Sequence, residues 1–145
     1  MARYPRFIEF RVYAGEQDGR GLFVYARVYA TKPEMLKALR ADALATAGNG
    51  FSDHTDGAMQ SFKRYKSNGR LVPCLGRVSL YQGRLGTEVV THEFAHVAFA
   101  WAHRKRLVGR LHEMPNEEQV CYVLGRMARR FVSRAIKLGL YEAEC

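Results

Sequence analysis

Two histidines and a glutamate stand together in the segment "HEFAH", residues His92 to His96. On a helix, residues four apart lie on one face about one turn apart, so two such imidazoles can hold one zinc ion. Glu93 directly follows the first histidine, where a carboxylate can take a proton from a metal-bound water. These residue types at this spacing predict a zinc-dependent hydrolase, with His92 and His96 as metal ligands and Glu93 as general base.

The residues around this motif have the pattern of a helix from about Thr87 to Arg104. Apolar residues occur on one side of it and again on the other, at positions that include Val90, Phe94, Val97, Trp101, Val89 and Phe99. We therefore expect a helix that is covered nearly all round, with its histidines buried or in a cleft. Buried imidazoles need partners, and a bound metal would supply one.

A catalytic zinc site usually has three protein ligands and one open position for water. The next predicted helix opens with two carboxylates, Glu117 and Glu118, in the segment "PNEEQVCYVLGRM". A short connection makes neighbouring helices roughly antiparallel, which we expect to bring this helix start close to the histidine pair. Glu117 and Glu118 are therefore the candidates for the third metal ligand.

The order H-E-x-x-H, followed by E-x-x-small-polar at the start of a later helix, resembles the glutamate-liganded zincin metallopeptidases. It is also similar to short zincin-like proteins carried by phages and mobile elements. The preceding "GRVSLYQGRLG" adds to this resemblance, since a strand and a turn lead into the motif helix. The resemblance covers residues 76–127, about a third of the chain. It implies a peptidase with one Zn²⁺ per chain, in which activated water attacks a peptide carbonyl of a protein or peptide substrate.

The two glutamates fit this pattern differently. With Glu118 as ligand, Cys121 takes the small position and Tyr122 the polar one, so the resemblance favours Glu118. Glu117 shares a helical stripe with Cys121 and Leu124 that is typical of a core-facing side. Both glutamates therefore stay candidates.

Peptide hydrolysis also needs a donor for the developing oxyanion. Tyr81, Tyr122 and His112 are the candidates. An alternative role for Tyr122 is to hydrogen-bond a ligand histidine. The alternative for His112 is that it is an ordinary surface residue. The resemblance further implies that the strand ending at Tyr81 offers its backbone edge to an extended peptide.

The rest of the chain predicts an α+β fold, a minimal zincin-like domain that spans residues 1–145. A small antiparallel or mixed sheet of about three strands is expected to pack on the motif helix and a long C-terminal helix. The expected strands are Arg6–Ala14, Gly21–Ala30 and Gly76–Tyr81, and the other helices run from Thr31 to about Gly48 and from Asn116 to about Gly139. Asn49 to Arg70 is polar and predicts a long loop, with a short helical turn near Met59–Tyr65.

The net charge of +9 favours nucleic acid or other acidic partners, although a soluble protein can simply be basic. Basic residues recur at helical spacing along the C-terminal helix, at Arg126, Arg130, Arg134 and Lys137. This stripe predicts either a solvated helix face or a surface for weak nucleic-acid contact. The alternatives to a peptidase are therefore a non-catalytic metal-binding zincin-fold regulator and a basic nucleic-acid-binding module.

Nothing in the sequence predicts a membrane segment. No apolar run is long enough to span a bilayer, and the first residues lack the apolar stretch of a signal peptide. The three cysteines, Cys74, Cys121 and Cys145, are scattered and odd in number, which is typical of a reducing compartment. We therefore expect a cytoplasmic protein.

Overall fold

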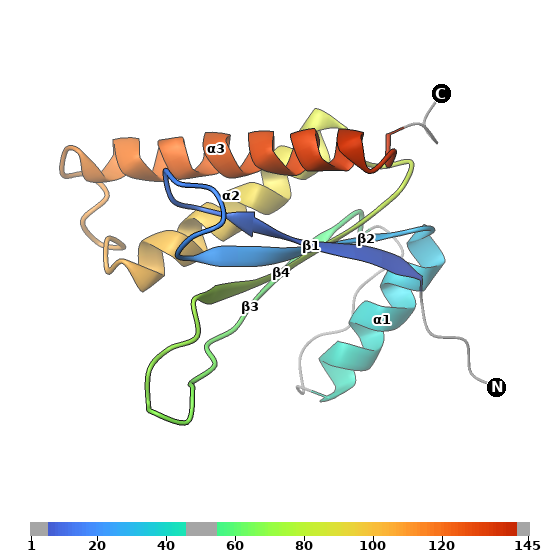
Figure 1. Ribbon diagram of the computed structural model, residues 1–145, viewed down its shortest axis with the longest axis horizontal. Coiled ribbons are helices and arrows are strands. Elements are labelled where there is room, and N and C mark those ends of the chain that lie inside the picture. The colour runs from blue at the N-terminus through green and yellow to red at the C-terminus, as the bar shows by residue number, and fades with distance from the viewer. Residues whose placement is uncertain (1–5, 46–54, 142–145) are drawn as a thin grey trace.

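The structure is a computed structural model that describes residues 6–45 and 55–141 (Figure 1). These residues form an α+β fold with a mixed four-stranded sheet and three helices, so the predicted fold class is confirmed with one more strand than expected. In chain order the elements are β1 (Phe7–Tyr13), β2 (Phe23–Tyr29), α1 (Lys32–Ala45), β3 (Ala58–Ser61), β4 (Cys74–Tyr81), α2 (Thr87–Arg104) and α3 (Asn116–Lys137).

The sheet has the strand order β1-β2-β4-β3. β1 and β2 form the predicted antiparallel hairpin, β2 and β4 are parallel, and β3 runs antiparallel to β4. The parallel pair needs a crossover connection, and α1 lies within that connection. Thr31 begins α1 as predicted, because its Oγ1 accepts a hydrogen bond from the backbone N–H of Glu34 at 3.3 Å.

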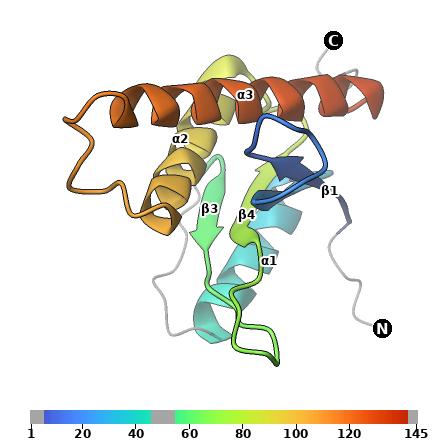
Figure 2. The same cartoon turned by 60° about the vertical axis from the view of Figure 1, so that its left-hand side comes forward.

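Helices cover both faces of the sheet, with α2 and α3 on one side and α1 on the other (Figures 1 and 2). Alternating residues of β2 and β4, such as Val24 and Val78, are fully buried on the α2–α3 side. Above them the rings of Phe94 in α2 and Phe131 in α3 lie 5.4 Å apart between centroids. On the other face, Met35 of α1 belongs to a second buried cluster with Tyr29 of β2.

The predicted loop from Asn49 to Arg70, with a helical turn near Met59–Tyr65, is wrong where Ala58–Ser61 forms the edge strand β3, and its residues 49–54 lie outside the described residues. The local sequence of β3, "AMQS", has no strand pattern, and the strand exists through its pairing with β4. The expectation that β4 offers a free backbone edge is also wrong. β4 is paired on both sides, by β2 and β3, and β3 takes the edge position.

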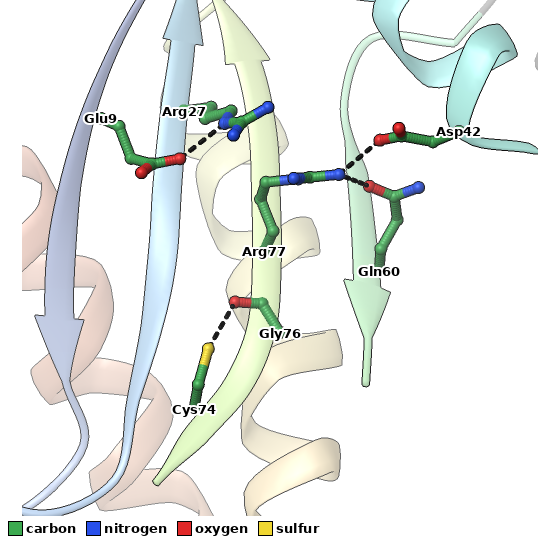
Figure 3. Close-up of polar contacts among 7 residues, drawn as sticks. All are labelled: Glu9, Arg27, Asp42, Gln60, Cys74, Gly76 and Arg77. Carbon is green, nitrogen blue, oxygen red and sulfur yellow. Dashed lines mark hydrogen bonds and ion pairs between the residues drawn. The ribbon is translucent and has the colours of Figure 1, made fainter. Parts of the chain in front are cut away.

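Arg77 of β4 holds the edge strand and α1 in place (Figure 3). Its guanidinium donates to Gln60 Oε1 of β3 at 3.1 Å and forms an ion pair with Asp42 of α1. The side chain is 18% exposed, so these contacts are partly shielded from water. On the same face of the sheet, Arg27 of β2 pairs with Glu9 of β1 at 2.6 Å. Polar side-chain bonds therefore link β1 to β2 and β3 to β4 on the side away from α2 and α3.

Two arginines of the predicted basic stripe on α3 have a structural role. Arg126 donates to the carbonyl oxygen of Ala14 at 2.8 Å, and Arg130 donates to those of Tyr13, Gly15 and Glu16 at 2.6 to 2.9 Å. These carbonyls belong to the end of β1 and the connection that follows it. The stripe is therefore in part an anchor for the β1–β2 hairpin.

In the described part of the chain, no helix combines the length and apolar character needed to cross a membrane. Cys74 is a buried free thiol and Cys121 an exposed one, while Cys145 lies outside the described residues.

A substitution at Gly76 of β4 tests how strongly β3 depends on its pairing with β4. Gly76 has φ of +147°, and a Cβ there would lie 2.1 Å from the carbonyl oxygen of Gln60. We expect Gly76→Ala to lower the free energy of unfolding by about 3 kcal/mol, because the new methyl group pushes β3 away. The matched control is Gly125→Ala in α3, where a Cβ meets nothing within 4 Å. That change should raise stability by roughly 0.5–1 kcal/mol, and similar effects of both changes in urea denaturation would contradict this role of Gly76.

Candidate active site

His92 and His96 lie side by side on α2, as their spacing predicts. Their ring centroids are 5.0 Å apart, with an angle of 78° between the rings. Both residues are exposed, and the His92 side chain keeps 67% of its surface accessible. The histidines are therefore not buried, and of the predicted alternatives, buried or in a cleft, the second fits His92, which borders a hollow.

The exposure of the pair follows from where α2 lies. β3 is only four residues long, and one side of α2 extends past this short edge strand without cover from the described residues. The exposed side carries a row of residues at helical spacing, namely Glu88, His92, His96, Phe99 and His103. Phe99 is 51% exposed there, although its apolar ring suggested burial. The pair therefore faces an open surface.

Glu93, beside His92 on α2, is buried, with 6% of its surface exposed. Burial raises the pKa of its carboxyl above the ordinary value, and the nearby His92 opposes this shift. The His92 Nε2 atom lies 3.9 Å from Glu93 Oε1. Gly57, just before β3, makes room for this side chain, because a Cβ at that position would lie 3.1 Å from Glu93 Cγ. A buried carboxylate thus sits directly beside an exposed imidazole.

A hollow of about 340 Å³ borders His92 and Glu93. Asp56, Arg84 and Glu88 also line it. Asp56 accepts a hydrogen bond from Tyr81 Oη at 3.0 Å, which is the main reason that the pKa of its carboxyl is lowered. Lys32 and Arg84 are its charged neighbours, at 3.3 and 3.4 Å.

Sequence reasoning missed Asp56, Gly57 and Arg84. The only local signal was that they stand in turn-like segments, "TDG" and "QGR".

Glu117 and Glu118 lie elsewhere, at the exposed start of α3. The end of α2 lies near the start of α3, since Trp101 and Lys105 share a hollow with Tyr122 of α3. His96 precedes Lys105 by nine residues, which is about 14 Å along a helix. The short connection therefore brings the glutamates to the end of α2 and not to its histidine pair.

The other predicted site residues are also dispersed. Tyr122 is 62% exposed and faces the hollow beside Trp101, and His112 is exposed in the connection after α2. Among the described residues, Tyr81 is the one oxyanion candidate that contacts the hollow at His92, through its hydrogen bond to Asp56. The roles of Tyr122 and His112 stay predictions.

The zinc hypothesis can be compared with these donors. Two exposed imidazoles one turn apart suit a metal ion as a ligand pair. Among the described residues, no group of three or more His, Cys, Asp or Glu side chains is arranged to hold a metal. The structure thus places His92 and His96 side by side, and the metal site itself stays a prediction.

Models of protein families, curated proteins and solved structures were each compared with this chain, and none of them matches it.

The buried Glu93 carboxylate should cost stability in the metal-free protein. Because its folded-state pKa is raised, the cost is absent at a pH below the ordinary carboxyl range and grows as the pH rises above that range. We expect Glu93→Gln to raise the free energy of unfolding at pH 7 by on the order of 1 kcal/mol, and the gain to vanish near about pH 4. Glu16→Gln, at an exposed position, is the control and should have no such pH dependence. A lower stability of Glu93→Gln at pH 7 would contradict this account.

Proposed function

We propose that the protein is a zinc-dependent hydrolase of the zincin type that acts on a protein or peptide. The observation that carries the proposal is the pair of exposed imidazoles, 5.0 Å apart, directly beside a buried carboxylate. Two surface histidines that were neighbours only by chance would not require the residue between them, Glu93, to be buried. A buried carboxyl whose nearest charged group is an exposed imidazole is costly to keep, which is typical of a group retained for chemistry.

Each residue of this arrangement has a role in the proposal. His92 and His96 hold the metal through their ring nitrogens. The bound zinc would supply a Lewis acid and a water of lowered pKa. Glu93 accepts the proton of the attacking water and donates it to the leaving amine. Its raised pKa makes this carboxylate a stronger base than an exposed glutamate.

The position of β3 favours an extended peptide as substrate. β3 is the edge strand of the described sheet, and its outer backbone groups are available for pairing. One hollow at its start borders His92 and another at its end borders His103, so α2 lies beside the strand along its length. A peptide that adds to this edge would pass close to the histidine pair.

Two sources remain for the third metal ligand. Glu117 and Glu118 follow from the resemblance, and Glu118 is the better match to its pattern. Asp56 follows from the geometry, because it borders the same hollow as His92. To reach a metal on the histidine pair, the Asp56 carboxylate has to turn away from Lys32 and Tyr81.

Zinc content tests the proposed function. After metal-free purification and reconstitution, we expect about one zinc per chain, lost in His92→Ala and in His96→Ala because each removes a ligand. His103→Ala, two turns along the same exposed side, is the matched control and should keep the metal. Glu93→Gln should keep zinc and lose hydrolysis of a casein substrate by about 100-fold or more. Wild-type protein that binds no zinc after reconstitution would refute the proposal.

Zinc affinity distinguishes the candidates for the third ligand. On geometric grounds we expect Asp56→Asn to weaken zinc binding by more than the roughly 10–100-fold typical of an outer-shell partner. Glu118→Gln and Glu117→Gln should each leave the affinity nearly unchanged. A competition titration with a chelating dye measures all three. The reverse result would place the third ligand on α3, as the resemblance implies.

A further inference from the structure

The chain between β3 and β4 forms an arm, residues 62–73, that projects from the body of the protein (Figure 1). Backbone hydrogen bonds run along it, from Val72 N–H to the Arg64 carbonyl at 2.7 Å and from Lys66 N–H to the Arg70 carbonyl at 2.7 Å. Tyr65 and Leu71 form a bridge between these bonds. The arm is therefore a narrow two-stranded ribbon that continues the β3–β4 pair.

The arm is strongly basic. It carries Lys63, Arg64, Lys66 and Arg70 and contains no Asp or Glu. All four basic residues are exposed, and none forms an ion pair with an acidic side chain in the described part of the chain. Tyr65 is 65% exposed on the same ribbon. Four positive charges without a local acid create a field that attracts anions.

The end of α2 extends this positive surface. Arg104 donates to the carbonyl oxygens of Val72 and Cys74 at 3.1 and 3.2 Å, so the base of the arm is docked on the last turn of α2. Lys105 and Arg106 follow directly and are exposed. Arg104 lies 32 and 30 residues after the two residues that it binds. The fold thus joins two basic segments that are well separated in the sequence.

The predicted basic stripe of α3 is a weaker candidate for the same purpose. Arg126 and Arg130 are engaged by backbone carbonyls of the β1–β2 hairpin. Arg134 and Lys137 are exposed, but they lie at the other end of α3 from the arm. The arm and the end of α2 therefore carry more exposed basic side chains than the α3 stripe does.

We propose that the arm and the end of α2 bind the phosphate backbone of duplex DNA. The major groove of B-form DNA admits a two-stranded ribbon, whereas the major groove of A-form RNA is too deep and narrow for side chains to reach into. Lysines and arginines that neutralise phosphates release counterions, which gives sequence-independent binding that weakens with salt. This inference does not depend on zinc or on hydrolysis.

Fluorescence anisotropy with a labelled duplex of about 20 base pairs tests the proposal, with the full metal-free chain titrated between about 50 and 200 mM salt. The decisive variant is Lys66→Gln/Arg70→Gln at the tip of the arm. Arg134→Gln/Lys137→Gln on α3 removes the same charge and is the matched control. We expect the arm variant to bind roughly tenfold more weakly at the lower salt and to lose about two from the slope of log K against log salt. The control should keep the wild-type slope.

Three results would overturn the proposal. They are no binding by the wild-type protein at the lowest salt, equal losses in both double variants, and tighter binding to a double-stranded RNA of the same sequence. Circular dichroism verifies that each variant is folded. Lys63→Gln/Arg64→Gln, nearer the base of the arm, provides a second variant that should repeat the loss. Zinc binding by the same samples is measured separately, so failure of one proposal leaves the other standing.

Discussion

The pairing of β4 on both of its sides is the constraint on which the rest of the structure depends. It places β4 inside the sheet, parallel to β2, with Val78 and Leu80 buried against α2 and α3. Only five residues separate the end of β4 from the start of α2, so the strand fixes where α2 begins. It also gives β3 its only described strand partner, and through β3 it positions Gly57 beside Glu93. The two sides of the candidate site are therefore both held by one strand.

The candidate site combines a buried carboxylate that lowers stability with two exposed histidines that hardly affect it. His92 and His96 are exposed, and their position costs the fold little, because water still solvates the rings. Glu93 is buried, and its raised pKa shows that the fold disfavours its charge. The surrounding packing of Leu80, Phe94 and Val97 must offset this cost. A polar group that is kept although it lowers local stability is typical of functional sites.

The three helices were predictable because their signals are local. Thr31 marks the start of α1, apolar spacing defines α2 from Thr87 to Arg104, and α3 follows Pro115 as expected. β3 was not predictable, since "AMQS" becomes a strand only through a partner that lies further along the chain. Half of the candidate site could not be predicted for the same reason. The spacing of "HEFAH" fixed the relation of His92, Glu93 and His96, but the contributions of Asp56 and Gly57 depend on where β3 meets α2.

Helical spacing also misjudged which sides of the helices are covered. An apolar residue such as Phe99 suggested cover on the histidine side of α2, yet the sheet stops at β3 and leaves that side open. Spacing cannot show where a sheet ends. For the same reason it described Arg126 and Arg130 as part of a free basic stripe, when the β1–β2 connection folds back over them.

The anchoring of that connection has a consequence for how the protein is made. Arg126 and Arg130 bind carbonyls that precede them by 112 to 117 residues. During synthesis at about 5–20 residues per second, the hairpin is complete on the order of ten seconds before its anchor exists. Until then the carbonyls of its connection depend on water. This hairpin is thus made well before the residues that hold its connection in place.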